Sequence, residues 1–187
     1  MDQIKIFAPA SVANVSCGFD VLGFCLEPVG DEMVIRKTES SGLKITKIVG
    51  QSLPLDVKKN VAGSAAEALL KSHPQKAGFE IEIYKNIKAG SGIGSSAASA
   101  AGAVYGINEL LGKPFKAEEL IAFAMEGEAL ASGSAHADNV APVLMGGITL
   151  VRSIDPIDVI QLPTPKELTA VILHPKIELK TIGTIRD

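Results

Sequence analysis

The sequence predicts a single domain of the α+β class. Strand-like segments come first along the chain, and helical patterns then alternate with single strands, which does not fit a doubly wound parallel sheet. The chain has 187 residues, close to the size of one ordinary domain, and 47% of them are hydrophobic, as in globular proteins. We therefore expect one core, without internal repeats or an interdomain linker.

Six segments are predicted to be strands because they are rich in Ile, Val and Phe and most are bounded by Gly, Pro or Ser. They are residues 4–8, 33–37, 43–49, 79–84, 148–152 and 168–173. Apolar residues alternate most clearly with glutamate in residues 79–84. This alternation predicts an antiparallel strand with one face exposed to water.

Three segments carry helical patterns, namely residues 60–72, 95–111 and 117–130. The second is rich in alanine and is followed by Gly112, which is typical of a helix end.

Composition and charge exclude several classes of function. The net charge is −3 and the longest basic cluster is the pair Lys58 and Lys59, whereas nucleic-acid binding needs a basic stripe. The chain has no Trp, two Tyr and six Phe, which disfavours an aromatic stacking platform. No apolar run approaches the roughly 20 residues of a membrane span, and the start lacks the features of a secretory signal. Cys17 and Cys25 do not suggest a disulfide framework, so we expect a cytoplasmic protein.

A glycine-rich segment at residues 88–99 is the strongest local signal. Gly90, Gly92 and Gly94 lie between a predicted strand and a predicted helix. Glycine allows close approach of the backbone to an anion, and a helix start offers free N–H groups. Ser95 and Ser96 follow, where a hydroxyl can cap the helix, contact a phosphate or bind Mg²⁺. The spacing fits neither the Walker motif nor the dinucleotide motif, and a tight turn is the alternative interpretation.

Two further segments contain polar residues among small and apolar ones. Asn14 and Asp20 follow the first predicted strand. A carboxamide and a carboxylate there suit the recognition of an ammonium group and a hydroxyl, and the alternative is an ordinary turn.

Glu128 lies near a helix end, where the dipole disfavours a negative charge, so it is either a metal ligand or an ordinary exposed glutamate. Asp138 is a candidate cap for the turn that follows. His136 has no spaced His or Cys partner and does not indicate zinc.

Together these segments resemble homoserine kinase of the GHMP kinase superfamily. The resemblance rests on residues 9–23, 90–99 and 132–142, and the last segment is the most particular to homoserine kinases. It implies the two-layer α+β fold of the GHMP amino-terminal domain, which is ribosomal protein S5 domain 2-like. It also implies ATP and Mg²⁺ as cofactors, L-homoserine as the substrate, and a homodimer with no nucleic-acid or membrane partner.

The resemblance also implies a role for each matching residue. Catalytic roles go to Glu128 and Asn139, and substrate binding to Asn14, Asp20, His136 and Asn139, with Asn139 orienting the substrate hydroxyl. Ser96 and Glu128 would bind Mg²⁺, with Ser95 as the competing serine. No dedicated carboxylate base is implied, so catalysis would come from alignment and charge neutralisation. The nucleotide would contact Asn60, Lys88, Ala89, Gly90, Ser91, Gly92, Ile93, Gly94, Ser95, Ser96, Ala97 and Ala98.

Two departures from the family pattern stand out. Lys88 replaces the usual proline and adds a positive charge beside the phosphates. Relatives continue after the position of Thr181 into a helix with an arginine and a second half, whereas here Arg186 is one residue out of register and the chain ends at Asp187. We expect residues 1–187 to be a GHMP amino-terminal ATP-binding domain whose carboxy-terminal GHMP domain is missing through an interrupted reading frame, which resequencing would test.

Three functions compete on this basis: an active homoserine kinase, a nucleotide-binding fragment without turnover, and a product that only self-associates. Another GHMP kinase of the mevalonate type is the alternative enzyme, and a substrate panel distinguishes it.

Overall fold

One long, curved strand organises the sheet. In the computed structural model, which describes residues 2–74, 77–133 and 136–173, β2 (Leu22–Thr38) pairs antiparallel with β1 (Gln3–Val12) along most of its length. The opposite edge of β2 pairs with β4 (Gly78–Tyr84) near its end and with β5 (Ile148–Ile154) at its start. β3 (Gly42–Val49) runs parallel to β4, and β6 (Ile157–Leu162) runs antiparallel to β5. The strand order is β3-β4-β2-β5-β6, with β1 beside β2.

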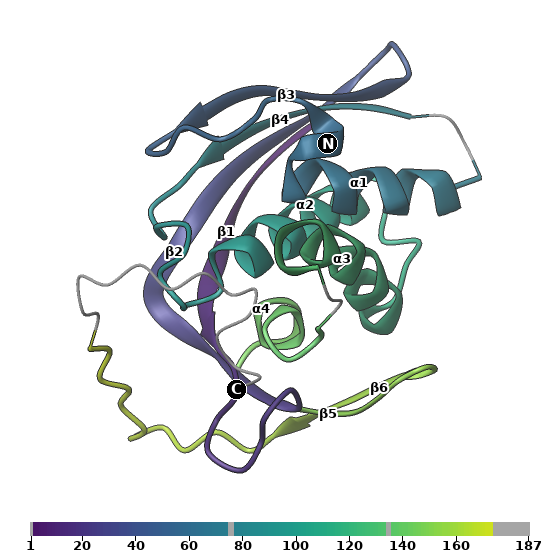
Figure 1. Cartoon of the computed structure of the whole chain (residues 1–187). Coiled ribbons are helices and arrows are strands. Elements are labelled where there is room, and N and C mark those ends of the chain that lie inside the picture. The colour runs from purple at the N-terminus through teal and green to yellow at the C-terminus, as the bar shows by residue number, and fades with distance from the viewer. Residues whose placement is uncertain (1, 75–76, 134–135, 174–187) are drawn as a thin grey trace.

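The helices form a second layer on one face of this sheet (Figure 1). They are α1 (Val61–Ser72), α2 (Ser95–Leu110), α3 (Ala117–Ser132) and the short α4 (Val140–Met145). A 3-10 turn, η1 (Val57–Lys59), precedes α1. In the described part of the chain the arrangement is therefore the two-layer α+β fold that the sequence predicts.

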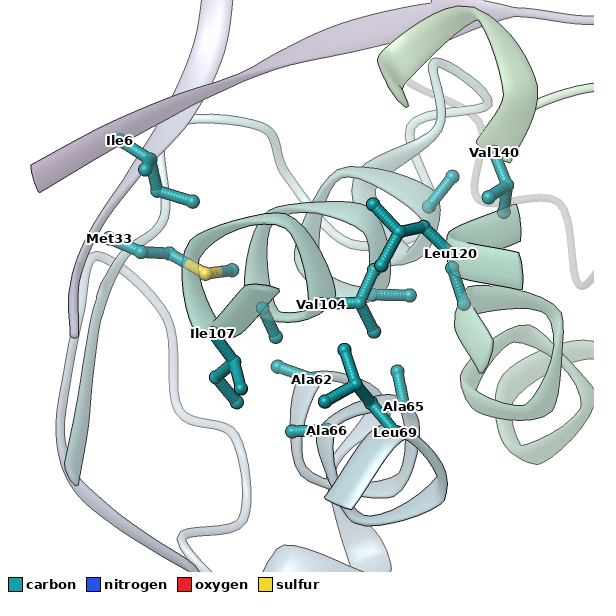
Figure 2. Close-up of a cluster of buried hydrophobic side chains, with 14 of the residues drawn as sticks. Ile6, Met33, Ala62, Ala65, Ala66, Leu69, Val104, Ile107, Leu120 and Val140 are labelled. Carbon is teal, nitrogen blue, oxygen red and sulfur yellow. The ribbon is translucent and has the colours of Figure 1, made fainter. Parts of the chain in front are cut away.

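The core lies between the two layers and depends on small residues in α2. A Cβ atom at Gly106 would lie 2.5 Å from Ile35 Cδ1, and one at Gly102 would lie 3.1 Å from Met33 Sδ. Figure 2 shows Ile6 and Met33 from the strands beside Ile107 of α2, with Leu69 of α1 next to Val104. Because α2 lies this close to the sheet, the start of α2 is fixed relative to β1 and β2.

The predicted elements agree with the structure apart from the carboxy-terminal strands. The three predicted helices correspond to α1, α2 and α3, and the five predicted strands from residue 4 to residue 152 lie within β1 to β5. The predicted strand at 168–173 is wrong: the segment is irregular, Val171 and Leu173 are 82% and 88% exposed, and none of the described strands pairs with it. The sequence analysis missed β6, because Asp158 and Gln161 interrupt its apolar pattern, and it missed α4.

Within residues 2–74, 77–133 and 136–173, we find no helix with the length and apolar character needed to cross a membrane. Both cysteines are free thiols, as expected.

Candidate nucleotide and substrate site

The glycine-rich segment forms a loop whose shape requires glycine. We call residues 87–95 the nucleotide loop. Gly90, Gly92 and Gly94 have φ angles of 73°, 77° and 67°, in the left-handed region that side chains disfavour. Gly94 is also the N-cap of α2, and no side chain of the described residues caps this helix start. The first N–H groups of α2 are therefore available to an anion, and the residues fit a phosphate chain.

Space is also restricted at one of these glycines. A Cβ atom at Gly94 would lie 2.1 Å from the Ser11 hydroxyl, whereas at Gly90 and Gly92 it would meet open space. The backbone of Ser11 donates to the Ile93 carbonyl at 3.2 Å. The end of β1 is thus in direct contact with the nucleotide loop.

The two serines after Gly94 differ in orientation. The Ser95 hydroxyl is buried and donates to the Ile87 carbonyl at 2.8 Å, which joins the two ends of the loop. The Ser96 hydroxyl, in contrast, lies close enough to the Glu128 carboxylate of α3 to lower the pKa of Glu128. This geometry favours Ser96 over Ser95 as the serine of a metal site.

Glu128 is a buried carboxylate, 8% exposed, rather than an exposed helix-end glutamate. Burial raises the pKa of Glu128 above its usual value, and the charge of Asp138 raises it further. The nearby Ser96 hydroxyl, His136 and Lys85 lower the pKa. The described residues contain no cluster of three or more His, Cys, Asp or Glu side chains arranged for a metal ion. A magnesium ion here would take Ser96 and Glu128 from the protein and its other oxygens from phosphate or water.

Asn139 lies beside Gly94, where an added Cβ would be 3.2 Å from Asn139 Oδ1. Its side-chain oxygen accepts a 2.9 Å hydrogen bond from the hydroxyl of Ser11, which is fully buried. Asp138 is also buried, and its Oδ1 accepts from the Asn139 backbone N–H at 3.0 Å. Burial raises the pKa of Asp138, opposed by His136 and by this hydrogen bond. This is a local bond between adjacent residues rather than the predicted cap, because α4 begins at the N-cap Asn139 and has no side-chain cap bond among the described residues.

Three of the four residues predicted to bind the substrate lie together at the surface, namely Asn14, Asp20 and His136. The backbone N–H of Asp20 donates to the Asn14 side-chain oxygen at 2.8 Å, which is a turn interaction. Asp20 Oδ1 is also 3.7 Å from His136 Nδ1, an ion pair when the histidine is protonated. The structure therefore brings Asn14, Asp20 and His136 together, with Asp20 and His136 each nearly half exposed.

Of the other residues predicted to contact the nucleotide, some are exposed and some are buried. Lys88 and Ala89 are exposed at the start of the nucleotide loop, and Ala97 and Ala98 are buried in α2. The Ser91 hydroxyl is buried and has no hydrogen-bond partner among the described residues. Asn60 caps α1: its oxygen accepts from Ala62 N–H at 3.0 Å, and its nitrogen donates to the Pro54 carbonyl at 2.8 Å. Its place beside the adenine stays a prediction, while Ser134, Thr181 and Arg186 lie outside the described residues.

Some residues at this site were not found from the sequence. Ser11 lies in the first motif but has no distinctive pattern. Gln51 supports the nucleotide loop, accepting from Ala89 N–H at 2.8 Å and donating to the Ile87 carbonyl at 2.6 Å. One feature of the sequence could have drawn attention to Asp31 and Lys85. Each is a charged residue within or next to an apolar strand segment.

Comparisons with known proteins bear on the family and the fold of the chain. The family model described as the GHMP kinases N terminal domain matches residues 60–147, which include the nucleotide loop, Glu128 and Asn139. Residues 60–147 of this chain are therefore similar to a GHMP kinase N-terminal domain. The fold of the chain is the GHMP kinase amino-terminal fold, as the first motifs implied.

The similar curated proteins are named homoserine kinase. The one from Chloroherpeton thalassium is 47% identical over 193 residues, covering 97% of this chain and 60% of the relative. The one from Methanococcus vannielii is 38% identical over 184 residues, with the same two coverages. This chain thus spans about 60% of the length of these relatives.

Solved structures show the same relationship. The crystal structure of homoserine kinase from Cytophaga hutchinsonii has a TM-score of 0.82 and 53% identity, and the match covers 88% of this chain and 53% of that one. A crystal structure of mevalonate kinase has a TM-score of 0.64 at 18% identity, covering 86% of this chain and 56% of that one. The second likeness concerns the fold alone.

Proposed function

We propose that this chain is the nucleotide-binding part of a homoserine kinase. The reaction would transfer the γ-phosphoryl group of ATP to the side-chain hydroxyl of L-homoserine, giving O-phospho-L-homoserine for threonine biosynthesis. The observation that carries the proposal is the 47% identity with a homoserine kinase over 97% of the chain, because it spans all three motif segments. The contacts among Ser11, Gly94 and Asn139 support it from the structure.

The nucleotide loop would bind the phosphates of ATP through backbone N–H groups. Left-handed glycines and the uncapped start of α2 suit this role. Lys88 is exposed and would add a positive charge near the phosphates. Asn60, at the start of α1, would lie near the adenine.

Ser96 and Glu128 would hold Mg²⁺, which neutralises charge on the transferring phosphoryl group. The fit rests on two neighbouring oxygen ligands, one of them a buried carboxylate whose pKa is raised by burial. Holding an ionised carboxylate in that position costs folding free energy, and a bound cation would offset this cost.

Asn14, Asp20, His136 and Asn139 would bind homoserine. The Asp20 carboxylate would pair with the ammonium group of the amino acid, and His136 would stand beside it. Because Ser11 occupies the Asn139 side-chain oxygen, the Asn139 amide nitrogen is left to donate to the substrate hydroxyl. The residues would thus act by alignment, which suits phosphoryl transfer.

The location and assembly belong to the same proposal. A metabolic kinase of this kind would act in the cytoplasm on a small molecule, without a nucleic-acid or membrane partner, and would form a homodimer.

The test is ADP release from ATP and Mg²⁺ by the purified chain, with homoserine, threonine or mevalonate as the acceptor. Turnover specific for homoserine supports the proposal, and turnover with mevalonate instead assigns the mevalonate type. ATP-dependent thermal stabilisation without turnover would mean a nucleotide-binding fragment. If ATP produces no turnover and no thermal stabilisation, nucleotide binding is contradicted. Light scattering would then identify a product that only self-associates.

A further inference from the structure

Two lysines flank the start of the nucleotide loop, and only Lys88 can reach a ligand. The side chain of Lys85 is 1% exposed and that of Asp31, its partner, is fully buried. Lys85 Nζ donates to Asp31 Oδ2, to the Ser95 carbonyl at 2.8 Å and to the Ser99 hydroxyl at 2.9 Å. These three bonds use all three protons of the ammonium group. Lys85 therefore has no donor left for a phosphate.

Asp31 connects the same lysine to the beginning of the loop. Its Oδ1 accepts from the backbone N–H groups of Asn86 and Ile87, at 2.7 and 2.8 Å. The Asn86 side chain donates to the Gly30 carbonyl at 3.1 Å, next to Asp31 on β2. The beginning of the nucleotide loop is thus attached to the central strand of the sheet.

The ion pair links this beginning to the end of the loop. Lys85 binds the carbonyl of Ser95 and the hydroxyl of Ser99, both in the first turns of α2. The Ser95 hydroxyl also donates to the Ile87 carbonyl at 2.8 Å. Residues 87 and 95 are therefore connected both directly and through the pair, while the segment from Gly90 to Gly94 between them is held from β1 by the Ser11 N–H, which donates to the Ile93 carbonyl.

Stability alone does not account for this pair. Two buried charges lose their hydration, and well-packed apolar residues of similar volume are often as stable or more so. What an apolar pair cannot provide is the set of directed hydrogen bonds to four groups at both ends of the loop. The pair lies between β2 and the first turns of α2, next to both ends of the loop, and this location indicates what those bonds do.

We propose that Lys85 and Asp31 form a positioning pair that holds the nucleotide loop in its binding conformation before a ligand arrives. The pair acts through the backbone and does not contact the nucleotide. Its effect on affinity rests on the proposed function, because only a nucleotide-binding chain has such an affinity. Its effect on the conformation of the loop does not depend on that function.

The test compares two double variants of the whole chain. Asp31→Asn with Lys85→Met removes both buried charges with little change in volume. Glu67→Gln with Lys71→Met removes an ion pair of the same kind on the surface of α1, where Nζ and Oε2 are 3.0 Å apart. Amide hydrogen exchange is followed without ligand at Ile87 and Ala98, near the two ends of the loop, and at Ala124 in the buried core of α3. The Kd of ATP with Mg²⁺ is measured by calorimetry.

The proposal predicts exchange about tenfold faster at Ile87 and Ala98 in the buried-pair variant, no change at Ala124, and a Kd about tenfold weaker. The surface-pair variant should match the wild type in each measurement. Unchanged exchange at the loop in a folded buried-pair variant would overturn the proposal. If the wild type binds no ATP, the proposed function fails, and the exchange rates still decide the conformational role.

Ser99→Ala covers the case in which the buried-pair variant does not fold. It removes one acceptor of Lys85 without leaving a buried charge unpaired. Exchange at Ile87 and Ala98 should rise by a few-fold relative to Ala124, and equal exchange at all three amides would contradict the positioning role.

Discussion

The nucleotide loop and the amino-terminal loop, residues 13–21, obtain unusual backbone conformations in different ways. The nucleotide loop uses glycines at its three left-handed positions. The amino-terminal loop uses Asn14, Ser16 and Asp20, with φ angles of 56°, 54° and 58°. Asn and Asp tolerate this region because their side chains bond locally to the backbone, as the Asn14 oxygen does with Asp20 N–H.

The two loops also differ in what fixes them. The nucleotide loop is attached to buried side chains from the sheet, namely Asp31 and Lys85, and to Ser11 at the end of β1. The amino-terminal loop is fixed by short-range bonds such as Gly18 N–H to the Val15 carbonyl at 2.9 Å, and Asn14 and Asp20 are exposed. The core therefore sets the shape of the nucleotide loop, whereas the amino-terminal loop leaves its polar side chains accessible to solvent.

Breaking the buried ion pair should have the largest effect on stability. Lys85→Met leaves the Asp31 carboxylate buried without its counter-charge, so we expect a loss of about 3–5 kcal/mol in unfolding free energy. Lys71→Met breaks an exposed pair and should cost less than about 1 kcal/mol. Urea denaturation followed by circular dichroism measures both. Equal losses would mean that the nucleotide loop is not attached to the core in the way described.

A pair of glycine substitutions tests the space around the nucleotide loop. Gly92→Ala and Gly94→Ala both place a side chain at a positive φ, which costs about 1–2 kcal/mol. Only at Gly94 does the new Cβ collide with Ser11 Oγ, so Gly94→Ala should cost about 1–3 kcal/mol more. Thermal unfolding gives the difference. If the two variants have the same stability, the contact between β1 and the loop is not tight.

Removing the buried charge of Glu128 should stabilise the metal-free chain at neutral pH. Glu128→Gln keeps a side chain of similar shape and avoids burying an ionised group, and we expect a gain of about 0.5–2 kcal/mol. The same variant should lose any stabilisation by Mg²⁺ with ATP.

The pH dependence has a definite sign. The folded-state pKa of Glu128 lies above its ordinary value of 4.5, so the folded state binds the proton more tightly than the unfolded state. The wild type therefore loses stability as pH rises through the folded-state pKa. The advantage of Glu128→Gln should be smallest below pH 4.5 and grow towards neutrality, as measured by unfolding at several pH values in EDTA. An advantage that shrinks with rising pH would contradict the burial of an ionised Glu128.

Changes in the amino-terminal loop should have the smallest effect on stability. Asp20→Asn weakens an exposed pair with His136, which is worth less than about 1 kcal/mol. The affinity for ATP should be unchanged, because Asp20 lies outside the nucleotide loop, whereas affinity for homoserine should fall. Calorimetry with each ligand separates the two effects, and a loss of ATP affinity would show that the two loops are coupled.

Local patterns predicted most of the helices and strands and the glycine-rich loop, whereas the roles of the candidate site residues came from the family resemblance and stay predictions. Glycine spacing, an alanine-rich helix and alternating strands indicate their structures directly. The roles of Ser11, Asp31 and Lys85 depend on contacts between residues 54 to 128 positions apart, and one sequence does not show which residues come into contact. The strand predicted at 168–173 failed for a related reason: an apolar segment becomes a strand only where a neighbouring strand offers hydrogen bonds.

The most direct test of this account is a titration of the ¹⁵N-labelled chain with ATP and Mg²⁺, followed by amide NMR spectra. The account predicts one set of sharp signals for Gly90, Gly92 and Gly94 before ATP is added. These signals should shift on binding, while those of Asn14 and Asp20 change little. No shift at the three glycines at saturating ATP, or shifts confined to the amino-terminal loop, would contradict the central claim that the nucleotide loop is a preformed ATP site.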